Sequence, residues 1–410
     1  MGSYSEVLIV GSGHAGAQAA ICLRQGKFAG SITIVGEEPD LPYERPPLSK
    51  EYLTGTKDAD QVLIRPASFW QSRGIVIMAG RRVEAVYPDR HRACLDDGLE
   101  LEYAHLVWAA GSRPRRLHCP GADLHGVHYI RTRAHADAIL RELESVKNIV
   151  IVGGGYIGLE AAATFVKLGK RVAVIESQDR VLARVTVESM SRFFESEHRA
   201  RGVGIHLGTN VEAFKERGGR VSDVALSNGV VLPAEMVVIG VGVVPVVEPL
   251  LVAGATGAGG VAIDRQCRTS LADIFAAGDC TLHENAYAPW LGPVRLESVQ
   301  NAFDQAAVAA GAILGGQAEY SSVPWFWSNQ FDLRLQSAGL SVGHDSVVIR
   351  GDPLRRAFSQ AYFREGRLIA MDCVNSAGDF AQAKNLIMRR AVLDMTHVGD
   401  PTKSLKDLVC

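Results

Sequence analysis

Short runs of apolar residues recur along the chain, and several of them are followed directly by glycines. Residues 6–10 (EVLIV) form one such run, residues 15–26 then show the spacing of a helix, and SITIVGEEP (31–39) is apolar again. Continuous apolar runs of this length are typical of strands buried on both faces of a parallel sheet. The pattern predicts a βαβ unit, and the same order recurs at residues 148–177.

The remaining segments predict further elements around these two units. Residues 41–53 read as a proline-stiffened loop, and residues 74–98 as strands with a hairpin. Strands are expected at 101–114 and 274–280, and helices at 134–146, 187–202 and 298–316. From Pro324 onward, strand-like segments alternate with turns, which predicts an antiparallel sheet with one late helix at 381–393. The chain is therefore expected to be an α/β protein with two Rossmann-like domains and a C-terminal α+β domain.

The first glycine-rich turn has the pattern Gly11-x-Gly13-x-x-Gly16 between a strand and a helix. The first glycine permits the tight turn, the second lets a pyrophosphate approach the backbone, and the third lets helix and strand pack closely. Glu37 lies 21 residues beyond Gly16, where a carboxylate can accept from a ribose hydroxyl. A tight turn without a ligand is the alternative, but the strand, the helix and the acid together favour a dinucleotide site.

The second turn repeats this pattern as Gly153-x-Gly155-x-x-Gly158, and Glu176 follows 18 residues after Gly158. A carboxylate at this place pairs with a ribose 2′-hydroxyl and repels a 2′-phosphate, so the sequence predicts a preference for NADH over NADPH. Two nearby arginines weaken this argument slightly: Arg180 and Arg184. A nicotinamide supplies a hydride, and a flavin is the economical receiver, so the two sites together predict a protein that brings the two rings into contact.

Charge and cysteine content exclude several other classes of protein. The formal net charge of -2 gives no case for binding nucleic acid or an anionic membrane. The seven cysteines form no close pair, which argues against a metal site, an iron–sulfur cluster or a redox-active dithiol on this chain. The N-terminal residues lack the features of a signal peptide, and the longest apolar stretch (236–247) is too short to span a bilayer. We therefore expect a cytoplasmic protein.

Several further motifs give the chain a resemblance to a known family. Besides the two fingerprints, the second of which ends in Glu160, they are YERPPLSK (43–50), WAAGSRPR (108–115), GVGVVP (240–245), IFAAGDC (274–280), ESVQNAFDQA (297–306) and PWFWSNQFD (324–332). In this order and along the whole length, the chain resembles the ferredoxin reductases of aromatic-ring dioxygenases and bacterial cytochromes P450. These are FAD-dependent pyridine-nucleotide reductases with a glutathione-reductase-like fold. The resemblance implies an FAD-binding domain of residues 1–117 and 246–323, an NADH-binding domain of residues 118–245, and a C-terminal α+β interface domain of residues 324–410.

The resemblance also implies roles for single residues. Lys50 would approach the flavin ring and pair with Glu160, and Trp327 would lie near the exposed flavin edge where a partner docks. Asp279 would bond a ribitol hydroxyl; the alternative is a helix N-cap, and both roles can hold. The positions expected to bind FAD are Gly11, Gly13, His14, Ala15, Gly16, Glu37, Arg45, Lys50, Val83, Ala110, Gly111, Arg131, Gly278, Asp279, Ser298, Val299 and Trp327. Those expected to bind NADH are Gly153, Gly155, Tyr156, Ile157, Gly158, Glu160, Glu176, Arg184 and Gly242.

Some of these residues could have purely structural roles, and two positions depart from the family pattern. Arg45 and Lys50 could be ordinary surface ion-pair residues, and Trp327 could be a core aromatic. Ala110 replaces a threonine that many relatives carry, so one hydroxyl contact is lost. Asn329 replaces an aspartate, which removes a charge near the expected docking edge.

The function implied is hydride transfer from NADH to FAD, followed by release of single electrons to a [2Fe–2S] ferredoxin that serves an oxygenase. Five arginines are candidates for a basic face toward an acidic ferredoxin: Arg113, Arg115, Arg116, Arg295 and Arg334. Taken singly, each is more readily interpreted as a solvated surface arginine. A rubredoxin or nitrite-system reductase and an NADH-responsive flavoprotein of the apoptosis-inducing type remain alternatives. A disulfide reductase is disfavoured, since residues 41–53 contain no cysteine. The protein is expected to be a monomer or a homodimer.

Overall fold

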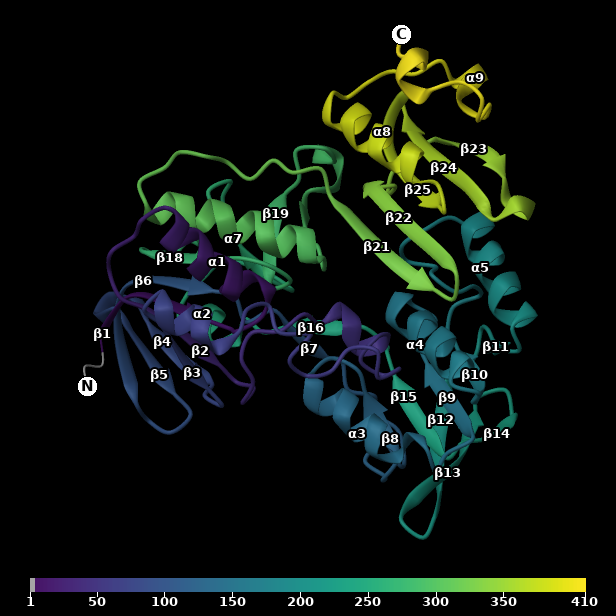
Figure 1. Cartoon of the computed structure of the whole chain (residues 1–410), viewed down its shortest axis with the longest axis horizontal. Helices are drawn as coiled ribbons and strands as arrows, with labels where there is room; N and C mark the ends of the chain where they lie inside the picture. The colour runs from purple at the N-terminus through teal and green to yellow at the C-terminus, as the bar shows by residue number, and fades with distance from the viewer. Residues whose placement is uncertain (1–3) are drawn as a thin grey trace. The chain divides into compact units, whose positions relative to one another are not determined.

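The computed structural model describes residues 4–410, and the chain divides into two compact units (Figure 1). The first unit contains the residues up to Glu44 together with Asp60–Arg113 and Val244–Phe326. The second unit contains Arg45–Ala59, Pro114–Val243 and Trp327–Cys410. Two short strands, β7 (Ser112–Pro114) and β16 (Val243–Pro245), lie where the chain passes from one unit to the other. Each fingerprint thus belongs to a different unit.

A seven-stranded sheet forms the centre of the first unit. Its strands are β1 (Tyr4–Val10), β2 (Ile32–Gly36), β3 (Ile75–Ala79), β4 (Val83–Tyr87), β5 (Arg92–Leu95), β6 (Glu100–Trp108) and β18 (Ile274–Ala276). The order is β3-β2-β1-β6-β5-β4, and β18 pairs with β6. Strands β3, β2, β1, β6 and β18 run parallel, whereas β4 and β5 add an antiparallel hairpin. The expected βαβ unit and hairpin are both present.

Both faces of this sheet are buried, which explains the continuous apolar runs. Val7 and Ile9 pack into a core with helices α1 (His14–Gln25) and α7 (Val299–Ile313). Leu8 points to the opposite face, into a second core shared with strands β4 to β6. The two helices lie side by side over the sheet (Figure 1). Their contact surfaces are rich in alanine, which lets their backbones approach closely.

Smaller elements complete the first unit. They are α2 (Ala67–Ser72), α6 (Glu248–Val252), β17 (Val261–Ala262), β19 (Thr281–Glu284), β20 (Pro293–Val294) and the 3-10 turns Pro88–Arg90 and Pro289–Leu291. Strand β19 pairs with β17 and β20 directly after Asp279. The interpretation of Asp279 as a helix N-cap is therefore wrong. Thr281 and His283 alternate inward along this strand, and such a period of two favours β structure over a helix.

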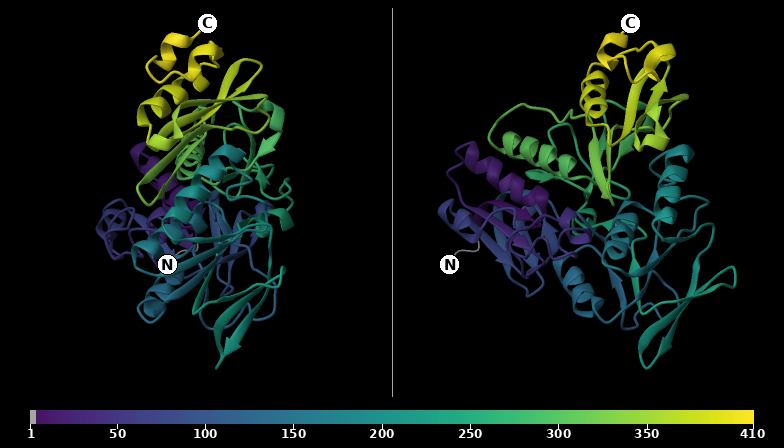
Figure 2. Two further views of the ribbon diagram at one scale, coloured as in Figure 1. Left: turned by 90° about the vertical axis from the view of Figure 1, so that its right-hand side faces the viewer. Right: turned by 45° about the vertical axis from the view of Figure 1, so that its right-hand side comes forward.

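The second unit is built on a parallel sheet of the order β11-β10-β9-β15-β8. The strands are β8 (Val127–Tyr129), β9 (Asn148–Val152), β10 (Arg171–Ile175), β11 (Gly204–His206) and β15 (Met236–Ile239). Its helices are α3 (Arg133–Leu143), α4 (Tyr156–Lys167) and α5 (Glu188–Ala200). An antiparallel sheet of β12 (Val211–Arg217), β13 (Arg220–Leu226) and β14 (Val231–Pro233) also belongs to this unit. Figure 2 shows the β12–β13 hairpin projecting beyond the parallel sheet in both views.

The C-terminal segment forms the antiparallel sheet that the sequence predicts. Its strands are β21 (Trp325–Gln330), β22 (Leu333–Gly339), β23 (Ser346–Asp352), β24 (Ala357–Arg364) and β25 (Arg367–Val374), in the order β21-β22-β25-β24-β23. The late helix, α8, spans Ala377–Met388 and not 381–393. It begins directly after Ser376, and Gly378 conceals this start in the sequence. It ends early because Arg390 adopts a left-handed conformation with φ of 54°.

Apolar contacts attach this sheet to the rest of the second unit. Leu159 of α4 and Phe194 of α5 share one core with Leu333, Phe358 and Val374. Residues 327–410 therefore belong to the same compact unit as residues 114–243. The division into three domains stays a prediction. Among the helices of residues 4–410, none combines the length and the apolar character that a membrane crossing requires.

The end of the chain is fastened by one buried arginine. Arg350 of β23 donates to Asp379 Oδ1 at 3.0 Å and to three backbone carbonyl oxygens. The carbonyls belong to Val398, Asp400 and Lys403. These residues come from α9 (Met395–Val398) and from the segment before the 3-10 turn Leu405–Leu408. This one side chain thus makes three of the hydrogen bonds that hold the C-terminal residues against the sheet.

Replacing this arginine should destabilise the second unit. Arg350→Met removes the cationic partner of Asp379, which retains the hydroxyls of Ser359 and Ser376, and takes away a donor from three carbonyls. Breaking a buried ion pair costs about 3 kcal/mol or more. Thermal unfolding should show a Tm several degrees lower. Arg355→Met is the matched control, since the Arg355 side chain is 85% exposed and lies 3.9 Å from Asp352. Equal Tm values for the two variants would contradict this assignment.

Candidate functional site

The first glycine-rich turn joins β1 to α1 and has the shape of a phosphate cradle. Gly11 has φ of 110°, and a Cβ there would lie 2.2 Å from the carbonyl oxygen of Ala109. A Cβ on Gly16 would lie 1.9 Å from the oxygen of Gly11. A Cβ on Gly13, in contrast, would meet no atom of the described residues within 4 Å. Two glycines are thus required by packing, and the third leaves open space at a helix N-terminus, where an anion can bind.

The second turn, between β9 and α4, repeats this geometry. Gly153 has φ of 112°, and its Cβ would lie 2.4 Å from the oxygen of Gly240. A Cβ on Gly158 would lie 2.0 Å from the oxygen of Gly153. A Cβ on Gly155 would meet no atom of residues 4–410 within 4 Å. Each unit therefore contains a cradle that fits the pyrophosphate of a dinucleotide.

The acid of the second cradle is held by the cradle itself. Glu176 Oε2 accepts from the backbone N–H of Gly154 at 2.7 Å. Its Oε1 accepts from the N–H of Gln178 at 2.9 Å and from the Ser177 hydroxyl at 3.2 Å. A carboxylate has about four acceptor positions, so capacity remains for a ribose hydroxyl. The sequence predicts Glu176 as a ligand but does not show that Gly154 orients it.

The two arginines near Glu176 differ in their freedom. Arg180 donates to three neighbours: Ala183 O, Thr186 O and Ser191 Oγ. Its guanidinium is committed to the loop before α5. Arg184 is exposed, and its guanidinium lies 3.7 Å from the position that a Cβ on Gly242 would take. Both arginines could favour NADPH by pairing with a 2′-phosphate. Of the two, only Arg184 is exposed and lies beside another residue expected to bind NADH, Gly242.

The acid of the first cradle stands in a different environment. Glu37 follows β2, its side chain is largely exposed, and Oε1 lies 3.8 Å from an Arg82 nitrogen. Arg82 makes a closer pair with Glu84 at 2.6 Å. An exposed pair of this kind contributes little to stability. Glu37 is therefore positioned mainly by the end of its strand.

A buried polar cluster fixes the turn that carries Asp279. Gln305 of α7 accepts from the N–H of Gly278 at 2.8 Å and from the Thr281 hydroxyl at 2.9 Å. Gly278 lies against α1, since its Cβ would be 3.3 Å from Ala15 Cβ. Ser112 donates to Asp279 Oδ2 at 3.0 Å. The predicted positions in IFAAGDC thus meet the first fingerprint within the first unit.

The ion pair that the resemblance implies between Lys50 and Glu160 is present in the second unit. Lys50 Nζ lies 2.6 Å from Glu160 Oε2, and the two side chains are only 13% and 7% exposed. Ser49 donates to the same oxygen at 2.9 Å, and Ser328 donates to Oε1 at 2.8 Å. Lys50 is therefore no ordinary surface residue. Its role in a reaction stays a prediction.

The predicted cofactor-binding residues divide between the two units. Those of the first unit are Gly11, Gly13, His14, Ala15, Gly16, Glu37, Val83, Ala110, Gly111, Gly278, Asp279, Ser298 and Val299. Those of the second are Arg45, Lys50, Arg131, Gly153, Gly155, Tyr156, Ile157, Gly158, Glu160, Glu176, Arg184, Gly242 and Trp327. Arg45 and Arg131 meet, because Arg45 donates to the Arg131 carbonyl at 2.7 Å. Ser298 caps α7, since its hydroxyl accepts from the Asn301 N–H at 3.1 Å.

Sequence reasoning missed the polar side chains behind the predicted ones. These are Ser49 and Ser328 beside Glu160, Ser112 beside Asp279, and Gln305 beside Gly278. All four lie inside motifs that carry the family resemblance. Their place in these motifs could have marked them as candidate site residues. Only the fold shows which partner each of them has.

The arginines proposed for a basic face are partly neutralised by local carboxylates. Arg113 lies 2.5 Å from Glu248, and Arg295 lies 2.6 Å from Glu297. Arg116 lies over the ring of Tyr129, 4.9 Å from its centroid. The basic face stays a prediction. The sequence overstates its positive charge, because Arg113 and Arg295 are paired with carboxylates.

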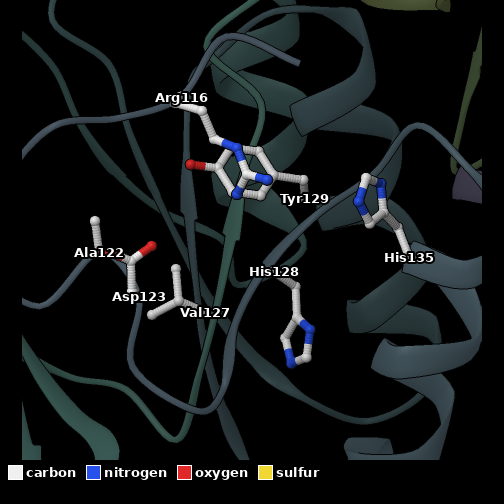
Figure 3. A pocket seen from close by; sticks show the side chains of 7 residues that line it. All are labelled: Arg116, Ala122, Asp123, Val127, His128, Tyr129 and His135. Carbon is white, nitrogen blue, oxygen red and sulfur yellow. The ribbon is translucent and has the colours of Figure 1, made fainter. Parts of the chain in front are cut away.

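A hollow of about 250 Å³ opens beside Arg116 and Tyr129 in the second unit (Figure 3). Its other lining residues are Ala122, Asp123, Val127, His128 and His135. His128 lies 3.6 Å from Glu142, and burial lowers the pKa of this histidine. The lining carries both signs of charge and includes only Arg116 among the residues singled out from the sequence. The hollow is therefore distinct from the glycine cradle of this unit.

Comparison with known proteins agrees with this arrangement. Residues 5–306 match the family model described as pyridine nucleotide-disulphide oxidoreductase, and residues 325–409 match the model described as reductase C-terminal. The chain is 51% identical over 407 residues to a ferredoxin–NAD(P)(+) reductase of a Sphingomonas species, covering 99% of this chain and 98% of that protein. It is 50% identical to a 5,5′-dehydrodivanillate O-demethylase ferredoxin reductase subunit of a Sphingobium species, with 98% of each chain covered.

Solved structures give the same result. The ferredoxin reductase for the CYP199A2 system from Rhodopseudomonas palustris matches with a TM-score of 0.95 and 38% identity over all of both chains. A covalent putidaredoxin reductase–putidaredoxin complex matches with a TM-score of 0.95 and 36% identity, covering 98% of each chain. Similarity that runs from end to end covers both fingerprints and the C-terminal sheet. The chain belongs to the pyridine nucleotide-disulphide oxidoreductase family and, within it, to the ferredoxin reductases.

Proposed function

We propose that this chain takes a hydride from NADH onto FAD and passes the electrons singly to a [2Fe–2S] ferredoxin, which feeds a Rieske dioxygenase or a cytochrome P450. The pair of glycine cradles, one in each unit, carries this proposal. A protein with a single dinucleotide would need only one such turn. Relatives named as reductases support the choice of acceptor, among them a putidaredoxin reductase and the ferredoxin–NAD(+) reductase component of an anthranilate 1,2-dioxygenase system.

The chain's own residues supply positioning and charge. A bound flavin would contribute the ability to accept two electrons together and to release them one at a time. Lys50 would provide a cation that favours a reduced, anionic ring, and Glu160, 2.6 Å from Lys50 Nζ, would hold this cation in place. Val299 begins α7, whose first N–H groups would stabilise further negative charge. Hydride transfer needs orientation more than an acid or a base, and these residues serve orientation.

One other acceptor and one function without a protein acceptor are compared with this proposal, and a disulfide acceptor is disfavoured. A rubredoxin-NAD(+) reductase of Pseudomonas putida is 34% identical over 369 residues, so rubredoxin is a second candidate. A disulfide substrate would require a pair of cysteines beside the flavin, and the segment 41–53 contains none. A redox-responsive sensor would bind both nucleotides without turning over a protein acceptor.

Anaerobic rapid mixing distinguishes these functions. The purified protein should be yellow, and NADH should bleach the flavin band within seconds. Addition of [2Fe–2S] ferredoxins should then restore the band rapidly, and rubredoxin should do so more slowly. A reduced state that persists in the presence of every ferredoxin would contradict the proposal and favour the sensor.

Glu176 should determine the choice between NADH and NADPH. Glu176→Ala removes both the acceptor for the ribose hydroxyl and the charge that repels a 2′-phosphate. The ratio of kcat/KM for NADH to that for NADPH should fall about tenfold or more, since one lost charged hydrogen bond is worth about 1.5–3 kcal/mol. Glu37→Ala, which alters the corresponding acid of the other cradle, should leave this ratio unchanged. An unaltered ratio in Glu176→Ala would refute the assigned role.

Gly155 and Gly158 should respond differently to the same substitution. Gly155→Ala adds a methyl group to open space, so the fold should persist, with the Tm within about one degree, while the Kd for NADH rises about tenfold. Gly158→Ala places its methyl group against the Gly153 carbonyl and should lower stability by about 1–3 kcal/mol. Calorimetric titration and thermal unfolding measure the two effects. Unchanged NADH affinity in Gly155→Ala would show that no phosphate lies there.

A further inference from the structure

A chain of buried polar side chains leads from helix α5 to Glu160. His198 Nε2 lies 2.9 Å from Gln330 Oε1, and Gln330 Nε2 lies 3.1 Å from Ser328 Oγ. Ser328 Oγ lies 2.8 Å from Glu160 Oε1. His198, Gln330 and Ser328 are fully buried. The chain connects α5, β21 and α4 within the second unit, and the ion pair with Lys50 stands at its end.

The hydrogen bonds of this chain all point the same way. Nδ1 of His198 has no hydrogen-bond partner among the described residues, and burial lowers the pKa of this histidine to about 4. The ring is therefore neutral near pH 7. Its single proton belongs on Nε2, because a buried N–H without an acceptor is rarer and costlier than an unused lone pair. His198 thus donates to the carbonyl oxygen of Gln330, which directs the Gln330 amino group toward Ser328.

This direction leaves Ser328 one way to use its proton. The lone pair of its hydroxyl accepts from Gln330, so the O–H donates to Glu160 Oε1. The other carboxylate oxygen accepts from Lys50 and Ser49. Within residues 4–410, Ser328 is the one donor that Oε1 receives. Ser328 therefore determines how the carboxylate is rotated, and hence where it holds the Lys50 ammonium.

We propose that Ser328 is a positioning residue for hydride transfer, which orients Glu160 and through it Lys50, and that Gln330 and His198 hold Ser328 in its donating state. This inference rests on the proposed function. Ser328 follows Trp327 directly on β21, and adjacent residues of a strand face opposite sides. One strand of the C-terminal sheet would thus serve the step that takes electrons from NADH, in addition to the step that delivers them.

The kinetic test uses the flavin-loaded protein without any ferredoxin. Ser328→Ala should lower the limiting rate of flavin reduction by NADH about tenfold, while the Kd for NADH changes less than about twofold. Ser328→Cys fills the same space with a weaker donor and should give a smaller loss in the same direction. Ser359→Ala is the matched control: Ser359 is equally buried on the same sheet and donates to a carboxylate, Asp379, at 2.9 Å. Its limiting rate should stay within about twofold of the parent.

A double-mutant cycle separates positioning from a general loss of structure. In the Glu160→Gln background, Ser328→Ala should change the limiting rate less than about twofold, because the oriented carboxylate is already gone. An equal loss in both backgrounds, or no loss in the parent background, would overturn the proposal.

The apoprotein supplies a second readout that needs neither flavin nor NADH. The Tm losses of Ser328→Ala and Glu160→Ala should not be additive, since each removes the hydrogen bond from Ser328 to Glu160; additive losses would overturn the inference. Failure of the proposed function appears elsewhere, as a reduced flavin that no ferredoxin reoxidises, and it leaves this cycle intact.

Discussion

Burial of the Glu160 carboxylate is the constraint on which the centre of the second unit depends. An ionised carboxylate taken out of water costs several kcal/mol unless charge and hydrogen bonds compensate for it. Compensation comes from Lys50 and Ser49 on one oxygen and from Ser328 on the other. These residues lie on a proline-rich turn and on a strand that follows α4 by more than a hundred and fifty residues. Satisfying one charge therefore requires three distant segments to meet in one arrangement.

The two cradles follow one packing rule but treat their acids differently. In both, the first and third glycines are compelled by carbonyl oxygens about 2 Å from where a Cβ would lie, and the second glycine faces open space. Glu176 is fixed by the N–H of Gly154 in its cradle and by the N–H of Gln178. Glu37, in contrast, is exposed beside Arg82. A fixed acceptor discriminates better between a hydroxyl and a phosphate, because it cannot turn away from an unsuitable partner.

Strand β21 carries two sets of residues on opposite faces. Its buried face carries Ser328 and Gln330, which lead to Glu160, and the alternate positions carry Trp327 and Asn329. The apolar core shared by α4, α5 and the C-terminal sheet holds this strand in place. The buried Asp372, which accepts from Ser337, Thr186 and Tyr362, adds a polar connection between the sheet and the loop before α5. The C-terminal sheet is thus joined by apolar and polar contacts to the unit that carries the second glycine cradle.

The sequence by itself determined the local features: the strands of the two βαβ units, the glycine cradles, the two acids and the antiparallel C-terminal sheet. These follow from periodicity and from steric needs that act over a few residues. It could not place the start of α8 or the strand after Asp279, where short segments are decided by burial. The pairing of Lys50 with Glu160 was inferred by resemblance, and only the tertiary structure revealed that Ser49 and Ser328 complete it. The physical reason is that a buried charge is satisfied by whichever donors the fold brings near, and those donors leave no spacing in the sequence by which to recognise them.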